Sequence, residues 1–332
     1  MSLINLKTLG LGSSPAFLGG TFTDVSNALG SDISNLFGPP AAPVSSSQPF
    51  SAMYFFGDSL SDVGNIYALT LHTFPAAPYV NGHFTNGPVW VEDLAASLNL
   101  AAPSPSVLGG TDFAYGGAET GADPLHAQTP ADLPSQLVQF EVSHPVPAAN
   151  ALYTLAIGGN DVIDAIAAYP ANPGGATADI AQAVGNETSF ISGLAAAGAR
   201  NLVVLNVPDL GKIPAETARG PAVAQLASAL SAMYDAQLSA SLGSLAATDH
   251  LNLHLVDAYS LLDQGVANPA AFGLANVTQP VWTGTFNNSA SGTENAVGAA
   301  QNSYLFFDGL HPTATGHQFV ADLAHASLFP VA

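Results

Sequence analysis

The stretch Tyr54-Phe-Phe-Gly-Asp-Ser-Leu-Ser-Asp62 passes from a run of aromatic residues directly into Gly-Asp-Ser. An apolar run that stops at such a turn is typical of a buried β-strand that ends at the edge of a sheet. Open α/β sheets bind their ligands at the carboxyl ends of their strands, so Ser59 is a candidate functional residue. The alternative is that Ser59 only caps the helix that follows, as serine often does.

Strand-like and helix-like segments alternate along the rest of the chain. The short apolar runs lie at residues 52–57, 152–158, 201–207 and 252–257. Helical patterns lie at residues 88–98, 176–199, 221–247 and 312–328, and Gly- and Pro-rich loops at residues 72–87, 101–130 and 264–300. This alternation predicts an α/β fold with a parallel sheet and helices on both of its faces. Loops at the edge of such a sheet usually shape a pocket.

The first 50 residues differ from the rest and predict two parts, an N-terminal extension at 1–50 and a main domain at 51–332. Apolar residues between Phe22 and Leu36 recur at spacings of three and four, which predicts one apolar helical face. The stretch from Gly38 to Pro49 is rich in Pro and Ser and predicts a semi-rigid linker. We expect this helical face to pack against the main domain, and the alternative is that it docks on a partner or a lipid surface.

The composition excludes several classes of partner and site. Four Lys and Arg residues stand against 24 Asp and Glu residues, which gives a formal net charge of −20. Such a chain has no basic surface for phosphate backbones, so we expect no nucleic-acid partner. The absence of cysteine excludes disulfides, thiolate metal sites and cysteine nucleophiles. The nine histidines are scattered without the spacing of a metal-binding helix, so we expect no metal.

Targeting signals in the sequence are weak. No stretch approaches the roughly 18 uninterrupted apolar residues of a membrane span. Met1–Lys7 makes a poor signal peptide because its one Lys follows the apolar residues. A low count of charges limits self-repulsion when carboxylates become protonated, which suits an acidic or extracellular setting. We therefore expect an extracellular or cell-surface location, with the cytoplasm as the alternative.

A second stretch, Phe307-Asp-Gly-Leu-His-Pro312, carries the residue types that activate a serine. A hydroxyl is a weak nucleophile until a base takes its proton, and His311 is a suitable base near neutral pH. Asp308 lies three residues earlier, close enough to orient the imidazole and stabilise its protonated form. The alternatives are that Asp308 caps the last helix and that His311 lies in solvent.

Two glycine-rich stretches supply candidate donors for the oxyanion of an acyl-transfer intermediate. They are Asp112-Phe-Ala-Tyr-Gly-Gly-Ala118 and Ile157-Gly-Gly-Asn-Asp161. The backbone N–H groups of Ser59 and Gly117 and the side-chain amide of Asn160 are the candidate donors. The alternative is that the Gly-Gly-Asn and Gly-Gly segments are only turns or close crossings of the chain.

Together the four stretches resemble the conserved blocks of the GDSL, or SGNH, family of esterases and lipases. Three other stretches resemble the same family: Gly82–Trp90, Asn206–Gly211 and Asn268–Thr278. The resemblance covers residues 52–328 and leaves out the first 50. It implies a three-layer α/β/α sandwich with a flavodoxin-like, mainly parallel sheet, and neither a metal nor an organic cofactor. It implies a catalytic set of Ser59, Asp308 and His311 and an oxyanion hole made by Ser59, Gly117 and Asn160.

We therefore predict an enzyme, a serine esterase or lipase that hydrolyses carboxylic esters through a covalent acyl-enzyme. Its partner is a small-molecule or lipid ester, and the chain is expected to be a monomer. One alternative is a phospholipase or acyltransferase of the same family. Another is a catalytically silent binding module on the same fold. The sequence does not indicate the acyl length or the leaving group.

Overall fold

The computed structural model describes residues 49–121, 131–144, 148 and 150–329. The predicted helical face between Phe22 and Leu36, and nearly all of the predicted extension, lie outside the described residues and stay predictions. Within the described part of the chain, none of the helices is long and apolar enough to cross a membrane.

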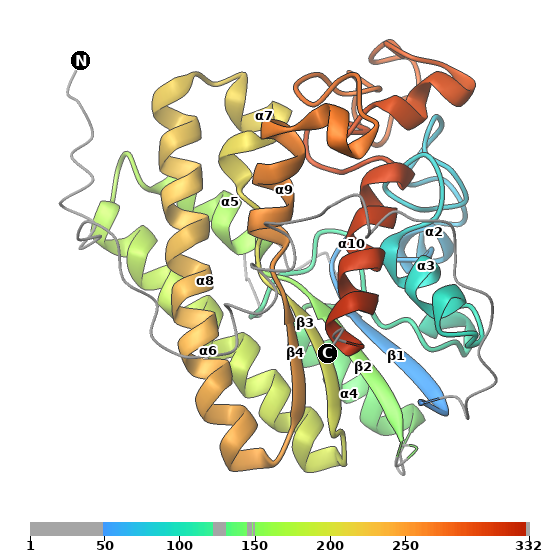
Figure 1. The fold of residues 1–332 in the computed structure, drawn as a ribbon, viewed down its shortest axis with the longest axis vertical. Helices are drawn as coiled ribbons and strands as arrows, with labels where there is room; N and C mark the ends of the chain where they lie inside the picture. The colour runs from blue at the N-terminus through green and yellow to red at the C-terminus, as the bar shows by residue number, and fades with distance from the viewer. Residues whose placement is uncertain (1–48, 122–130, 145–147, 149, 330–332) are drawn as a thin grey trace. The chain divides into compact units, whose positions relative to one another are not determined.

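The centre of the fold is a parallel sheet whose four strands follow one another in chain order (Figure 1). The strands are β1 (Ala52–Gly57), β2 (Ala151–Ala156), β3 (Asn201–Leu205) and β4 (Asn252–Val256). In the register of the sheet, Gly57 pairs with Ala156, so β1 and β2 end level with each other. All six residues of β2 are buried, as expected for a parallel sheet covered on both faces.

A short segment extends the sheet beyond β1. The Phe55 N–H donates to the Thr111 carbonyl at 3.1 Å, and the Phe113 N–H donates to the Phe55 carbonyl at 2.7 Å. Asp112 thereby forms a parallel bridge with Phe55. Counting this segment, the order across the sheet is 2-1-3-4-5, the order of flavodoxin-like folds. The expected fold class is confirmed.

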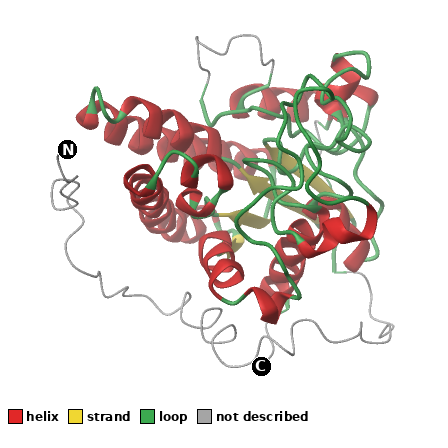
Figure 2. Cartoon of the chain, turned by 90° about the horizontal axis from the view of Figure 1, so that it is seen from above, coloured by secondary structure: helices red, strands yellow, loops and turns green. Residues whose placement is uncertain are grey.

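Helices cover both faces of the sheet, and Figure 2 shows the strands enclosed among them. The α-helices are α2 (Asn65–Leu69), α3 (Trp90–Ser97), α4 (Leu133–Ser143), α5 (Gly159–Ala168), α6 (Pro173–Ala197), α7 (Pro214–Thr217), α8 (Pro221–Asp249), α9 (Ala258–Ala267) and α10 (Ala314–Leu328). The 3₁₀ helices are η3 (Ser106–Leu108), η4 (Leu210–Lys212), η5 (Pro269–Phe272) and η6 (Gly298–Ser303). In one group of helices, α6 packs against α4, α5 and α8. In another, α10 packs against α3.

The predicted elements are present, with shifted ends. The helix expected from residue 88 begins at Trp90, because Val89 is extended and its N–H is held by the Glu92 side chain at 2.9 Å. The helix expected from residue 312 begins at Ala314, where the Thr313 side chain accepts from the Gly316 N–H. Helices α2, α4, α5, α7 and α9 were not predicted, and the last turn of α9 lies in a segment expected to be loop.

Candidate active site

The turn after β1 is fixed by a glycine and a buried glutamine. Gly57 has a φ of 140°, and a Cβ there would lie 2.1 Å from the Ala156 carbonyl oxygen, so only glycine fits. The buried Gln136 accepts from the Gly57 N–H at 2.9 Å and donates to the Gly57 carbonyl at 2.8 Å. This clamp holds the end of β1 two residues before Ser59.

Ser59, His311 and Asp308 form a chain of hydrogen bonds. The Ser59 Oγ lies 2.7 Å from Nε2 of His311, although 252 residues separate the two in sequence. The His311 Nδ1 lies 2.8 Å from Oδ2 of Asp308. His311 and Asp308 are buried, whereas Ser59 is half-buried. The serine is therefore reachable while its partners are shielded from water.

Asp308 is held as a carboxylate by several donors. Its Oδ1 accepts from the N–H groups of Leu310 and His311, both at 2.7 Å, and its Oδ2 accepts from the Tyr79 hydroxyl at 2.7 Å. Burial alone would raise the pKa of Asp308, but the His311 charge and these hydrogen bonds outweigh it and lower the pKa. An ionised Asp308 requires Nδ1 of His311 to carry a proton, which leaves Nε2 of neutral His311 to accept from Ser59.

The candidate oxyanion donors lie on two connected segments. Asn160 is the second residue of α5, and its Nδ2 donates to the Ala118 carbonyl at 2.8 Å, which leaves a second Nδ2 hydrogen. The neighbouring Gly117 is exposed with a φ of 81°. The Gly116 N–H is already used, since it donates to Oδ2 of Asp62 at 2.9 Å. Within the described residues the Gly117 N–H has no partner, which favours Gly117 over Gly116 as the donor.

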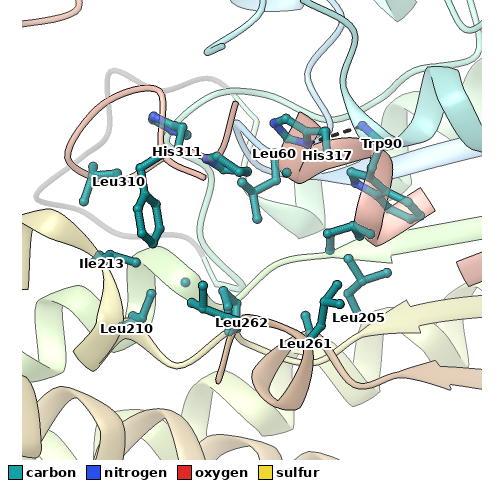
Figure 3. Close-up of a pocket in the computed structure, with 18 of the residues that line it drawn as sticks. Leu60, Trp90, Leu205, Leu210, Ile213, Leu261, Leu262, Leu310, His311 and His317 are labelled. Atoms are coloured by element: carbon teal, nitrogen blue, oxygen red, sulfur yellow. Dashed lines mark hydrogen bonds between the residues drawn. The ribbon is translucent and has the colours of Figure 1, made fainter. Parts of the chain in front are cut away.

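An apolar pocket with a volume of about 140 Å³ opens beside Ser59 and is lined by Asn160 and His311 as well. Its other walls come from the ends of β2 and β3 and from α5, η4, α9 and α10. In Figure 3 the leucines along one side of the pocket are Leu205, Leu210, Leu261 and Leu262, across from Leu60 and His311. Ser59 is thus placed at the junction between a polar hydrogen-bonded cluster and an apolar cavity.

The family model described as GDSL-like lipase/acylhydrolase matches residues 53–324. The chain belongs to this family. It is 30% identical to Esterase EstA of Pseudomonas aeruginosa over an alignment that covers 86% of this chain and 48% of that protein. It is 29% identical to a phosphatidylcholine-sterol acyltransferase of Aeromonas hydrophila over 239 residues, which cover 71% of this chain and 67% of that protein.

This GDSL protein spans about half the length of the esterase relative that it matches. Among solved structures, an extracellular lipase of Streptomyces rimosus matches 83% of the chain and all of the lipase at 19% identity, with a TM-score of 0.40. The sequence comparisons therefore establish a GDSL-family hydrolase with relatives named as esterases, lipases and acyltransferases.

Three residues at the GDSL site were not singled out from the sequence. Tyr79 contacts Asp308 from a loop 229 residues away, a distance across which no sequence pattern connects them.

Burial, opposed by the Leu60 N–H and the His311 charge, raises the pKa of Asp58 to about 7. Burial and the neighbouring His311 and His83 lower the pKa of His317 to about 3, so His317 is neutral and accepts from the Trp90 N–H at 3.3 Å.

The described residues contain no group of three or more His, Cys, Asp or Glu side chains arranged to hold a metal ion. The chemistry available at this GDSL site is that of a shielded imidazole, a carboxylate, a serine hydroxyl and amide donors. This set suits acyl transfer through a serine ester.

Proposed function

We propose that this protein hydrolyses carboxylic esters through a covalent acyl-enzyme on Ser59. The observation that carries the proposal is the pair of contacts at 2.7 Å and 2.8 Å that link Ser59 to His311 and His311 to Asp308 beside an apolar pocket. Membership in the GDSL family supports the same reaction class.

In this mechanism Nε2 of His311 takes the Ser59 proton as Oγ attacks the ester carbonyl carbon. The imidazolium that forms is stabilised by the ionised Asp308. The negative oxygen of the tetrahedral intermediate accepts from the Ser59 and Gly117 N–H groups and from Nδ2 of Asn160. His311 then returns its proton to the leaving alkoxide, and water attacks the acyl-serine by the reverse of these steps.

Transfer of the acyl group to an alcohol is a second candidate, favoured by the relative named as an acyltransferase. The two reactions share the acyl-enzyme and differ in which hydroxyl attacks it. Adding an alcohol during ester cleavage separates the two reactions. A transferase forms the new ester in a larger fraction of its turnovers than the molar fraction of alcohol in the solvent. A pure hydrolase releases the free acid.

Labelling with a fluorophosphonate probe tests the nucleophile. We expect the wild type to be labelled and to cleave p-nitrophenyl acetate, and Ser59→Ala to lose both properties with an unchanged melting temperature. Ser61→Ala is the matched control, because Ser61 is buried in the same turn and accepts from the Trp90 indole at 3.0 Å instead of contacting His311. Labelling that persists in Ser59→Ala contradicts the proposal, and a folded wild type that is neither labelled nor active favours a silent binding module.

A further inference from the structure

We propose that the apolar pocket beside Ser59 holds the acyl chain of the substrate, and that the face of α9 in this pocket sets the acyl length that the enzyme prefers. This inference rests on the proposed function and names the substrate class as uncharged esters of medium-length or longer aliphatic acids. The leaving alcohol lies outside the pocket.

The lining of the pocket selects an uncharged aliphatic group. The side chains that line it are mostly aliphatic or aromatic and include Ile163, Leu205, Leu261, Leu262 and Phe272. Within the described residues no Lys or Arg lines the pocket, so a carboxylate at the far end of an acyl chain would find no partner. An alkyl chain instead gains free energy for every methylene that it removes from water.

The order of bond breaking decides which half of the ester occupies the pocket. After Ser59 attacks, the alcohol takes its proton from Nε2 of His311 and must depart before water enters at the same place. An alcohol held in an apolar cavity walled by β2, β3, α9 and α10 would obstruct that exchange. The acyl group stays bonded to Oγ throughout, so the cavity next to Oγ suits the group that does not leave.

Helix α9 presents one regular face to the pocket. Its lining residues are Ala258, Leu261, Leu262 and Gly265, at the spacing of three and four that marks one side of a helix. Gly265 is buried within the helix, where glycine is less favourable than alanine. A Cβ at Gly265 would meet Leu305 Cδ2 at 3.8 Å, an ordinary contact. The backbone therefore tolerates a side chain here, and the glycine leaves open a volume that a side chain would take from the pocket.

The test compares two substrate series on the full chain. One series is p-nitrophenyl esters from acetate to decanoate, and the other is acetate esters of alcohols from ethanol to decanol. We expect kcat/KM of the wild type to rise about fourfold for each added acyl methylene until the pocket is filled. Lengthening the alcohol is expected to change kcat/KM by less than twofold per methylene.

Gly265→Leu is expected to lower the ratio of kcat/KM for octanoate over acetate at least tenfold. The matched control is Gly243→Leu, since Gly243 lies on the exposed side of α8 with open space around it, and this variant keeps the wild-type ratio. Leu262→Ala enlarges the pocket and is expected to move the preferred acyl length upward. Gly265→Leu and Leu262→Ala shift the preferred acyl length in opposite directions, so together they distinguish a change in pocket volume from a loss of folding.

Three results would overturn the inference: an acyl series without length preference, a Gly265→Leu effect confined to the alcohol series, or unchanged preferences in both pocket variants. Each of these leaves the proposed function standing, provided that fluorophosphonate still labels Ser59. A wild type that is neither labelled nor active with any ester overturns the proposed function itself, and this inference with it.

Discussion

The Tyr79 hydroxyl donates a hydrogen bond of 2.7 Å to Oδ2 of Asp308, the same oxygen that lies 2.8 Å from Nδ1 of His311. Tyr79 is buried among aromatic rings, with Phe307 at a ring-centroid distance of 5.0 Å. Burial, together with the Asp308 charge, raises the pKa of Tyr79, so its hydroxyl remains a donor. The carboxylate that orients His311 is therefore itself oriented by a residue from a distant loop.

We expect Tyr79→Phe to reduce kcat about 10-fold with little change in KM, because a hydrogen bond to a charged group contributes about 1.5–3 kcal/mol. Without this donor the buried carboxylate is more easily protonated, so the pKa of Asp308 rises in the variant. Loss of the ionised form of Asp308, which orients His311, then begins at a higher pH than in the wild type. The acidic limb of the kcat/KM profile should move to higher pH, which a pH series from 4 to 9 measures.

Tyr304→Phe is the control for the loss of a hydroxyl, because Tyr304 packs against the same aromatic cluster. This variant should keep both the turnover and the pH profile of the wild type. A Tyr79→Phe enzyme with an unshifted acidic limb would contradict a positioning role for Tyr79, whatever its turnover.

The residues of the candidate site could be named from the sequence because each stands in a short motif that resembles one in the GDSL family. Asp308 and His311 share one loop, so their contact is local, whereas the contact of Ser59 with His311 spans 252 residues and was expected from the resemblance to the GDSL family. The Tyr79 contact and the Gln136 clamp were not predictable. Both are made by side chains from segments far away in the sequence, and only the folded chain brings them to the site.

The sheet was predicted better than the helices around it. Short runs rich in Val, Leu and aromatic residues identify buried strands directly, and all four lie within two residues of their expected ends. Helix α5 follows β2 after only Ile157 and Gly158, so its Gly-Gly-Asn start resembled a simple turn. The edge segment around Asp112 pairs with β1 by a single bridge, too short for a periodic pattern to mark.

Asn160→Ala tests the side-chain donor of the oxyanion hole. We expect kcat to fall about 10²–10³-fold with a nearly unchanged KM, because this donor acts on charge that develops in the transition state. Steady-state kinetics with p-nitrophenyl acetate measure both constants. Since Asn160 also holds the Ala118 carbonyl, circular dichroism and a melting curve should accompany the kinetics. A variant within fivefold of the wild-type kcat would exclude Asn160 from the oxyanion hole.

Gln136→Leu tests the clamp on the end of β1. Leucine has a volume similar to that of glutamine but makes no hydrogen bonds. The Gln136 side chain accepts from the Gly57 N–H at 2.9 Å and donates to the Ala131 carbonyl at 2.7 Å, so the variant leaves both groups without this partner. Each unpaired buried group costs about 1–3 kcal/mol, so we expect the free energy of unfolding in urea to fall by about 2–6 kcal/mol. Gln182→Leu, on the exposed side of α6, should change this free energy by less than about 0.5 kcal/mol. Equal stabilities for the two variants would show that the clamp is not needed.

Buried acids give this chain an unusual dependence of stability on pH. Burial raises the pKa of Glu187 to about 8, with Asp161 adding to the shift and the Tyr234 hydrogen bond opposing it. The Glu187 Oε2 accepts from the Tyr234 hydroxyl at 2.6 Å, and Oε1 has no partner among the described residues. Between the ordinary glutamate pKa of about 4.3 and pH 8, the folded chain holds a proton that the unfolded chain has released. The Glu187 contribution to stability therefore falls as pH rises through this window.

Glu187→Gln is expected to remove this dependence, because glutamine keeps the shape of the protonated acid and never ionises. Wild type and variant should have similar unfolding free energies at pH 4.5. At pH 8.5 the variant should be more stable by at least about 1.4 kcal/mol, the equivalent of one pKa unit. Urea unfolding at both pH values measures the difference, and Glu141→Gln, which removes an exposed carboxylate from α4, controls for the change in net charge. If Glu187→Gln lost as much stability between pH 4.5 and 8.5 as the wild type does, Glu187 would be ionised in the folded chain well below pH 8. The decline of stability with pH would then have to come from other buried acids. Candidates are Asp58 and Asp62, whose pKa values burial raises to about 7 and about 6.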